Sequence, residues 1–369
     1  MSLLFKALAA RHGDSLAIHY GDPARPFTIA IDGGPGNGPL LDYLEELRDL
    51  EEDEAYPIEL LMVSHIDDDH IGGVLHFLEH LDGQKLKKPF PIKRVWHNSF
   101  DSLVGKGEVS RLASTAGFAE VASFSAEVET VVADEYSQAI LSSVPQGMKV
   151  ATLSRKHASS INEGRDLLLR DGTTVFELPG GAKLELICPK KEAVEKLRQV
   201  WKKAVEALAK KRQKEGKVAA VDLDDSPFNM SSLVFLLSYE GRRILLCGDA
   251  LCNDVMDGLT ELGLMEDGHI HVDLLKIPHH GSPRNNTLEW FQRVTADTYV
   301  FSGNGGSGNP DLRTIKRLVE ARQGSKYSVY FTYDMPEIRT YLEANLPKDG
   351  SVTVVFGSEA DNGVTLELA

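Results

Sequence analysis

Four apolar segments of the chain each run into an aspartate or a histidine, with glycine or another small residue close behind. The segments are FTIAIDGG, IELLMVSHIDDDHIGG, RILLCGDA and LLKIPHHGS. Apolar runs of this kind are typical of buried strands, and a polar group at the end of such a strand is costly unless it is paired or bound to a metal. One such ending alone would indicate a cap or a turn. Four of them favour strand ends that share a function.

The segment HIDDDHIGG carries the densest group of these residues. If a strand ends there, His65 and Asp67 lie two residues apart and can point the same way. Asp69 and His70 then begin the next helix and can turn back to the same point, and the glycine pair that follows permits a close approach. Imidazole with carboxylate suits zinc, manganese or iron, and more carboxylate favours the harder metals. We interpret this segment as part of a metal site and not as an acidic surface loop.

Strand-like runs and helical periodicities alternate along the chain, with most strands in its first and last thirds. The glutamate and glycine at 240–241 predict the turn of a hairpin between two apolar runs. Residues 100–225 read as mostly helical. This order of elements predicts two sheets packed face to face with outer helices.

Residues 190–217 are predicted to form a basic amphipathic helix, with eleven Lys or Arg against four Glu. Its apolar stripe consists of Val194, Leu197, Trp201, Val205 and Leu208. We favour a solvated helix that docks through this stripe. The alternative is a basic rim that draws an anionic substrate towards an acidic protein.

The composition excludes some classes of function. A formal net charge of −15 argues against nonspecific wrapping of nucleic acid, which needs many contacts between Lys or Arg and phosphate, but it leaves room for a site where bound cations attract anions. The 3 cysteines form no CxxC pair, which indicates a reducing, cytoplasmic compartment. No run approaches the roughly 18 apolar residues that a membrane span requires, so we expect no membrane partner.

The motifs HIDDDHIGG, IDGG, CGDA and PHHGS together resemble those of the metallo-β-lactamase-fold hydrolases. The aspartate at position 67, where a histidine is more usual, resembles the ComEC-type branch, the hydrolase domain of a competence DNA-uptake protein. The blocks RHGDSLAIHYG, LELICP, NMSSLVFLLSYEGRRILLCGDA and SGNGGSGNPDLRTI resemble the same branch. The resemblance covers most of residues 3–98 and 172–369. It implies a single domain over residues 1–369, an α/β four-layer αββα sandwich. Residues 100–171 and the basic helix are not matched by it, and we interpret 100–225 as a mostly helical insertion into that fold.

The resemblance also implies two divalent metal ions, zinc or manganese, with magnesium as a further option. The residues that match the family's ligands are His65, Asp67, Asp69, His70, Asp249 and His280. By this match His65 and Asp67 hold the first ion. Asp69, His70 and His280 hold the second, and Asp249 bridges the two.

Three neighbours of these ligands receive other roles. We give His279 a role beside the ligands or the substrate, although its assignment could be exchanged with that of His280. Asp32 resembles the family's aspartate that supports the metal loop without binding metal. Asp68 stands between two ligands and is expected to face solvent.

The sequence departs from the family pattern at two positions. Asn229 stands where many relatives have a third histidine, and its amide oxygen suits manganese or magnesium better than zinc. His97 could fill that gap, although we favour a partly buried loop histidine. Asn309 stands where ComEC-type sequences carry a histidine before proline, so a proton donor for the leaving group is absent or is His279.

These features predict a metal-dependent hydrolase in which water held between the ions is the nucleophile, oriented by Asp69. We expect a phosphodiester substrate, either a nucleic acid or a nucleotide. Ser282, Asn285, Asn286 and Arg284 could contact its phosphate, although a plain turn explains this segment equally well. One alternative is a small-molecule hydrolase, a lactonase or a phosphocholine-type esterase, for which a narrow pocket capped by the middle segment would be the sign. Another is a degenerate metal-binding module that acts through a protein partner, which Asn229 and Asn309 motivate.

Overall fold

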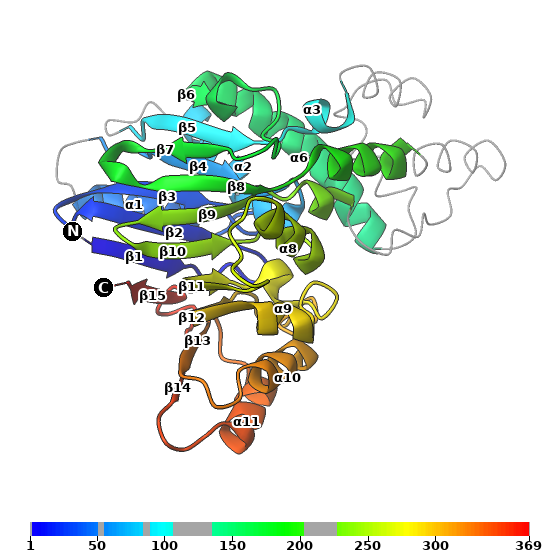
Figure 1. Cartoon of the computed structure of the whole chain (residues 1–369). Coiled ribbons are helices and arrows are strands. Elements are labelled where there is room, and N and C mark those ends of the chain that lie inside the picture. Colours follow the sequence, from blue (N-terminus) through cyan, green and yellow to red (C-terminus); the bar gives the residue numbers. More distant parts are fainter. Residues whose placement is uncertain (1, 51–54, 84–88, 106–134, 203–226, 369) are drawn as a thin grey trace.

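The computed structural model describes residues 2–50, 55–83, 89–105, 135–202 and 227–368, and two β-sheets form its centre (Figure 1). Within these ranges the first sheet has seven strands in the order β15-β1-β2-β3-β4-β5-β6. Its strands are β1 Ser2–Ala7, β2 Leu16–Asp22, β3 Arg25–Ile31, β4 Leu60–Val63, β5 Ile92–His97, β6 Ala158–Ile161 and β15 Val364–Glu367. The first and last strands of the chain therefore lie side by side and pair antiparallel.

The second sheet has eight strands, again counted over the described ranges, in the order β14-β13-β12-β11-β10-β9-β8-β7. Its strands are β7 Val175–Glu177, β8 Lys183–Cys188, β9 Val234–Tyr239, β10 Arg242–Leu246, β11 Ile270–Lys276, β12 Val294–Phe301, β13 Tyr327–Phe331 and β14 Val352–Phe356. The turn of the β9–β10 hairpin is Glu240–Gly241, as predicted, with both residues at positive φ.

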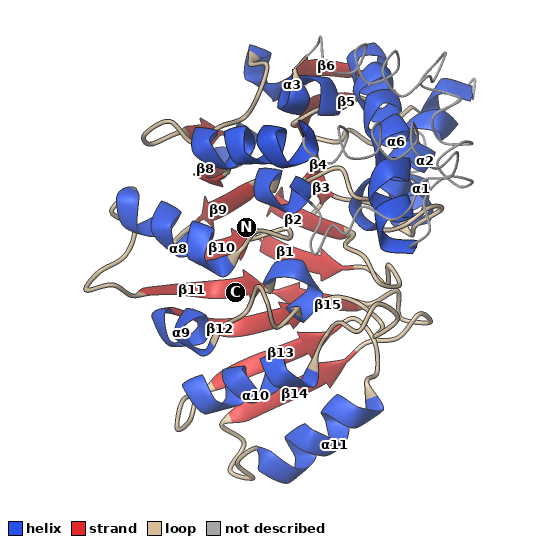
Figure 2. Ribbon diagram, turned by 90° about the vertical axis from the view of Figure 1, so that its right-hand side faces the viewer, coloured by secondary structure: helices blue, strands red, loops and turns tan. Residues whose placement is uncertain are grey.

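Helices cover the outer face of each sheet, and Figure 2 shows α1, α2 and α6 gathered in one part of the molecule and α9, α10 and α11 in another. The helices are α1 Leu40–Leu50, α2 Asp68–Gly83, α3 Phe100–Val104, α6 Glu135–His157, α8 Cys252–Glu261, α9 Leu288–Arg293, α10 Leu312–Ala321 and α11 Pro336–Asn345. No helix in the described ranges combines the length and the apolar character needed to cross a lipid bilayer.

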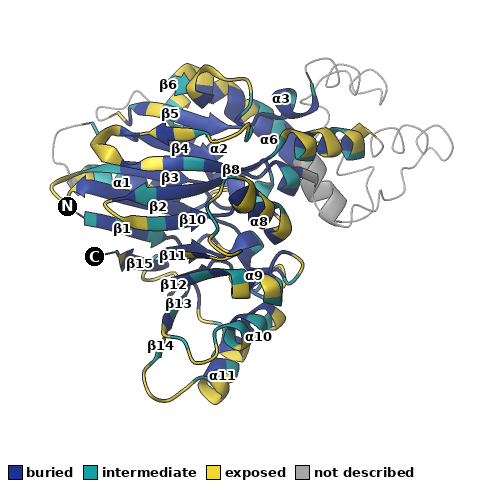
Figure 3. Cartoon of the chain, viewed as in Figure 1, coloured by how far each residue is buried: buried dark blue, intermediate teal, exposed yellow. Residues whose placement is uncertain are grey.

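Three apolar clusters hold these layers together. The cluster between the sheets includes Phe5, Trp96 and Phe235, all fully buried. A second cluster joins the outer face of the first sheet to α1, α2 and α6, and a third joins the second sheet to α8 through α11. Figure 3 shows the central strands mostly dark blue, as buried residues, whereas the edge strands and the outer faces of the helices carry exposed residues. The predicted four-layer αββα sandwich is therefore confirmed, and it is consistent with a metallo-β-lactamase-like fold.

Strand β4 shows why its sequence is apolar throughout. Leu60 and Met62 point into the cluster between the sheets, whereas Leu61 and Val63 point to the cluster beneath the helices. Because successive side chains of a strand face opposite ways, a strand buried on both faces needs apolar residues at every position.

The predicted mostly helical segment at 100–225 also contains strands. Its described residues include α3 and α6, but also β6, β7 and β8, which extend both sheets at their edges. Strands β6 and β7 were missed because they are four and three residues long, too short to show a periodicity. In the predicted basic helix, residues 191–202 are helical and bury Val194, Leu197 and Trp201 against the first sheet's helices. Residues 203–217 lie outside the described ranges.

Glycines allow α2 to pack directly on the loop after β3. The N–H of Gly33 donates to the carbonyl of His70 at 2.8 Å, and the N–H of Gly73 donates to the carbonyl of Gly34 at 2.8 Å. A Cβ atom added to Gly73 would lie 1.9 Å from the carbonyl oxygen of Gly33. The start of α2 is therefore held in place by backbone contacts that leave no room for a side chain.

We expect Gly73→Ala to lower the free energy of unfolding by about 1–3 kcal/mol, because the new methyl group must push α2 away from the loop. Gly83→Ala in the same helix is the matched control, since its Cβ would meet nothing within 4 Å. The control should be unchanged or gain up to about 1 kcal/mol. Urea unfolding followed by circular dichroism measures both, and equal effects would contradict this packing.

Candidate metal centre

The candidate site lies where parallel strands of both sheets end. Strands β3, β4 and β5 run parallel, as do β10 through β14, so their carboxyl ends point to one edge of each sheet. Asp32 follows β3, His65 follows β4 and Asp249 follows β10. His279 and His280 follow β11 in the short 3-10 turn Pro278–Gly281. The topology therefore brings these strand ends together. In open α/β sheets, ligands bind in the crevice outside the carboxyl ends of the strands.

Four imidazoles point their Nε2 atoms at the carboxylate of Asp249. His70 Nε2 lies 3.2 Å and His280 Nε2 lies 3.6 Å from its Oδ1. His279 Nε2 lies 3.4 Å and His65 Nε2 lies 3.9 Å from its Oδ2. Asp249 is itself buried at 2% exposure, so it forms the centre of the group.

The opposite nitrogen of each imidazole meets an oxygen that accepts a hydrogen bond. His70 Nδ1 lies 2.8 Å from Asp32 Oδ2, and His279 Nδ1 lies 3.0 Å from Asn285 Oδ1. His65 Nδ1 lies 3.1 Å from Ser64 Oγ, whose own hydrogen is donated to Asp32. A neutral imidazole held this way carries its hydrogen on Nδ1 and a lone pair on Nε2.

Lone pairs and carboxylates thus face one another, which is favourable only if a cation lies between them. His65 Nε2 and Asp249 Oδ1 are buried and have no hydrogen-bond partner among the described residues. Two ligand atoms each about 2.1 Å from an ion at a tetrahedral angle lie roughly 3.4 Å apart. The separations of His65 Nε2 from Asp67 Oδ2 and of His280 Nε2 from Asp69 Oδ2 are both 3.4 Å. The residues present therefore fit divalent metal ions.

The charge balance leads to the same conclusion. Burial alone would raise the pKa of Asp249, but His279, His70 and His280 hold it well below its ordinary value. Burial alone would lower the pKa of His280, but Asp249 and Asp14 raise it to about 9. Burial would likewise raise the pKa of Asp69, but His70 and His280 lower it to about 2. In metal-free protein, protons supply the positive charge that this cluster needs.

Asp32 supports the metal loop, as predicted, and its contacts show how. Its Oδ1 accepts from the Ser64 N–H at 2.7 Å, and its Oδ2 accepts from Ser64 Oγ at 2.6 Å. The same Oδ2 holds His70 Nδ1. Asp32 adopts a φ of 57°, a left-handed conformation that aspartate tolerates better than most residues. One carboxylate thus orients the side chains of two consecutive motifs.

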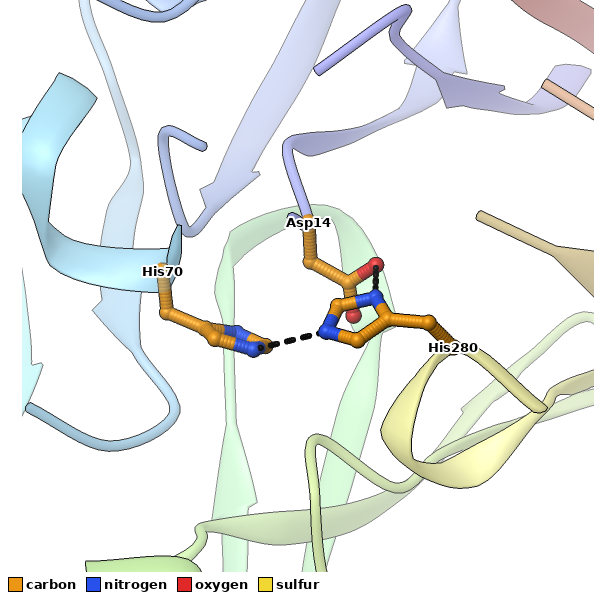
Figure 4. A group of neighbouring side chains, drawn as sticks. All are labelled: Asp14, His70 and His280. Carbon is orange, nitrogen blue, oxygen red and sulfur yellow. Dashed lines mark hydrogen bonds and ion pairs between the residues drawn. The ribbon is translucent and has the colours of Figure 1, made fainter. Parts of the chain in front are cut away.

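Asp14 has a similar place behind His280, and we did not predict it. His280 Nδ1 lies 3.3 Å from Asp14 Oδ1 and 2.9 Å from Ser302 Oγ, while His280 Nε2 lies 3.2 Å from His70 Nε2 (Figure 4). The other oxygen of Asp14 pairs with Lys276 Nζ at 2.9 Å, and both side chains are 1% exposed. Asp14 also belongs to a group of potential metal-binding side chains with His70 and His280. Because it contacts the rear nitrogen of His280 and is neutralised by Lys276, we interpret it as a support.

The three aspartates of HIDDDHIGG differ in their contacts. Asp67 and Asp69 lie against His65 and His280 as described above, and Asp69 is the more exposed of the two, at 26%. Asp68 Oδ1 instead accepts from Gln146 Nε2 of α6 at 2.8 Å. The expectation that Asp68 faces only solvent was therefore incomplete, because α6 packs over the start of α2.

The residues after His280 contact both their own loop and the loop after β10. Asn285 Nδ2 donates to the carbonyls of Asp249 and Ala250, and the carbonyl of Ser282 accepts from Asn286 Nδ2. Of the residues predicted near phosphate, Ser282, Asn285 and Asn286 are buried, and Arg284 is the one whose side chain reaches solvent.

The predicted auxiliary residues lie at differing depths. Asn229 is buried in the 3-10 turn Pro227–Ser231, and its Oδ1 has no hydrogen-bond partner among the described residues. Asn309 lies half-buried in the loop after β12. His97 ends β5 on the strand face that packs under the helices, and its burial lowers its pKa to about 4. Two groups of side chains in the described residues could hold a metal ion: Asp14, His70 and His280, and His65, His70 and Asp249. Neither contains His97, which is a buried histidine of the first sheet.

No protein-family model matches the sequence, and no curated protein matches it either. Among solved structures, one from Parabacteroides distasonis ATCC 8503, provisionally named a metal-dependent hydrolase, is similar with 11% identity and a TM-score of 0.37, covering 89% of this chain and 92% of its own. A CmlA β-hydroxylase E377D mutant is similar with 12% identity and a TM-score of 0.37, covering 100% of this chain and 54% of its own. The assignment of the metal site is therefore based on the topology and side chains of this chain, which fit a metal-dependent hydrolase.

Asp14→Asn is expected to lower the free energy of unfolding by about 3–5 kcal/mol, because it leaves the buried charge of Lys276 without its partner. Adding Lys276→Met should recover much of that loss, since it removes the unpaired charge. Chemical unfolding of the two single variants and the double variant measures the coupling. Simple additivity of the two single effects would contradict a buried ion pair.

His97 should contribute to acid sensitivity of the fold. Its pKa is about 4 in the folded protein and near 6.5 when unfolded, so its contribution to stability is complete above pH 6.5 and is lost as the pH falls towards 4. Between pH 7.5 and 4.5 we expect His97→Leu to lose about 2–3 kcal/mol less unfolding free energy than the wild type. Urea unfolding at both pH values tests this, and parallel losses in the two proteins would refute it.

Proposed function

We propose that the chain is a binuclear metal-dependent hydrolase that acts on phosphodiesters. The observation that carries the proposal is the position of Asp249, whose two carboxylate oxygens face different imidazoles. Its Oδ1 faces His70 and His280, and its Oδ2 faces His65 and His279. A single buried carboxylate with ligand atoms on both sides is suited to bridging two cations.

Zinc or manganese would suit the mixed nitrogen and oxygen donors, and magnesium is a further candidate because three of the donors are carboxylates. When bound, such ions lower the pKa of coordinated water and neutralise charge on the attacking and leaving oxygens of an in-line displacement. His65, His70 and His280 would hold them through Nε2. Asp67, Asp69 and Asp249 would supply the negative charge.

Asp69 is the residue best placed to act on the attacking water. Its pKa of about 2 keeps it ionised at neutral pH, and its partial exposure leaves it accessible from solvent. An ionised carboxylate in this position accepts a hydrogen from water and orients the water's lone pair towards the substrate. Asp32 and Asp14 do not meet the substrate in this scheme, because both lie behind the imidazoles that they hold.

A phosphodiester substrate is supported by the oxygen-rich donor set and by the resemblance of the motifs to the ComEC-type branch, to which we propose the chain is related. Exposed Arg284 stands four residues after His280 and carries a guanidinium that suits phosphate. The substrate would be a nucleic acid or a nucleotide, and the free, buried cysteines agree with a cytoplasmic location.

The purified chain, stripped of metal and supplied with Mn²⁺, Mg²⁺ or Zn²⁺, should hydrolyse at least one of single-stranded DNA, double-stranded DNA, RNA and a bis-aryl phosphate. Asp69→Asn and His70→Ala should each reduce kcat/KM by a factor of at least about 100, as loss of groups at the reacting centre does. Asp68→Asn is the matched control, because Asp68 contacts Gln146 and not the cluster; it should stay within about threefold of the wild type.

Absence of metal-dependent turnover on the whole panel would overturn the phosphodiester assignment. Binding of less than one ion per chain would overturn the enzyme assignment as well, and would favour a metal-poor module acting through a partner.

A small-molecule hydrolase is a second candidate, and one cavity favours it. A cavity of ≈250 Å³ adjoins the centre, with Ser232 and Ala250 on the side of Asp249 and Asn229 in its wall. Ala193 and Lys196, which come from the middle segment, also line it. The volume suits a small substituent, so turnover of the bis-aryl phosphate or of a phosphocholine ester without turnover of any polymer would select this candidate.

A further inference from the structure

The two consecutive histidines of the turn after β11 face opposite oxygens of Asp249. His279 Nε2 lies 3.4 Å from Oδ2, and His280 Nε2 lies 3.6 Å from Oδ1. The two histidines therefore contact different oxygens of the central carboxylate. His279 shares its oxygen with His65, whereas His280 shares its oxygen with His70.

An unusual backbone produces this arrangement. His279 has φ 48° and ψ 50°, and His280 has φ 51° and ψ 13°, so two non-glycine residues in succession are left-handed. Such conformations cost energy and persist where surrounding structure imposes them. Here the N–H of His279 donates to the carbonyl of Gly248 at 2.9 Å, which fixes the turn against the loop that carries Asp249. An extended strand would instead have sent the two imidazoles to opposite faces of the sheet.

Asn285 determines which nitrogen of His279 is available. Its Nδ2 donates to the carbonyls of Asp249 and Ala250, at 3.0 Å and 3.2 Å, so its Oδ1 is the atom that faces His279 Nδ1. The His279 hydrogen is therefore placed on Nδ1, and Nε2 presents a lone pair to Asp249 Oδ2. Two acceptors at 3.4 Å repel each other unless a cation lies between them, and that distance matches two ligands of one tetrahedral ion.

We propose that His279 is a metal ligand, and that it completes the first site with His65, Asp67 and Oδ2 of Asp249. His280 then serves the second site with Asp69, His70 and Oδ1 of Asp249. This rests on the proposed binuclear centre and deepens it. The two consecutive histidines then bind different ions. Both are ligands, so there is no need to choose between them. His279 supplies the nitrogen that Asn229 and His97 do not, and it is no longer the proton donor for a leaving group.

The number of metal ions bound per chain tests whether His279 and His280 bind different ions. The full chain is stripped with chelator, dialysed against buffered free Zn²⁺ and measured by mass spectrometry of the metal per folded chain. The wild type should bind two ions. His279→Ala and His65→Ala should each leave one ion, and the double variant His65→Ala/His279→Ala should also leave one, because both residues serve the same ion. The double variant His279→Ala/His280→Ala should leave none.

Two further measurements separate a ligand from a positioning residue. His279→Ala should weaken the affected Zn²⁺ equivalent by more than about 100-fold, beyond the 10–100-fold loss typical of a residue that only orients a ligand. Imidazole added to His279→Ala should restore binding of the second Zn²⁺ ion. In the Co²⁺-substituted variant it should also restore the visible absorption of the Co²⁺-substituted wild type. His271→Ala is the matched control. His271 lies on β11, the strand that leads to the turn, but it is exposed and pairs with Asp297 of β12. This variant should retain two ions.

Circular dichroism identifies the variants that fold, and if His279→Ala does not fold, His279→Gln takes its place with the same expected loss. Two tightly held ions in the folded His279 variant would overturn this inference and leave the binuclear centre standing. Fewer than two ions in the wild type would instead count against the proposed function itself.

Discussion

The mutual repulsion of buried acceptors around Asp249 is the constraint on which the rest of this structure depends. Imidazole lone pairs and carboxylate oxygens converge from both sheets within distances of 3.2–3.9 Å. Such a group is stable only with positive charge inside it, supplied by protons in the metal-free chain and by divalent ions in the loaded one. Cation binding should therefore also stabilise the contact between the two sheets at this edge, because ligands from both sheets share one charge.

A second layer of buried polar groups keeps the acceptors aimed inwards. Asp32 with Ser64 holds His65 and His70, and Asp14 with Lys276 holds His280. Asp14 precedes β2 in the first sheet, whereas Lys276 ends β11 in the second, so their ion pair also joins the two sheets. Orientation at the centre and cohesion of the sandwich thus depend on the same side chains.

Much of this arrangement could be predicted from apolar runs that end in Asp or His. A strand buried on both faces leaves a strong sequence signal, and residues at its carboxyl end, such as Asp249, are then placed by topology. Asp14 could not be found this way, because it precedes its strand and its partner Lys276 is distant in the sequence. The weak signals were the segment RHGD before an apolar strand and a lysine at the end of the apolar run in DLLK.

The edge strands and the two histidines show why local patterns were insufficient elsewhere. Strands β6 and β7 are four and three residues long, too short for a periodicity to develop. The two histidines His279 and His280 face different oxygens because both have positive φ angles. Two identical adjacent residues give no sequence signal for such a conformation. The turn is fixed by tertiary contacts such as the hydrogen bond from the N–H of His279 to the carbonyl of Gly248. It also requires glycine at 281, where a Cβ would lie 2.9 Å from Phe301.

Anomalous X-ray diffraction from crystals of the zinc- or manganese-loaded chain tests the central claim most directly. A binuclear centre should give two anomalous peaks about 3.5–4 Å apart, as in two-metal sites, on either side of the Asp249 carboxylate. One should lie against His65 and His279, and the other against His70 and His280. No peak at this position, or a single peak on one side under saturating metal, would contradict a binuclear centre.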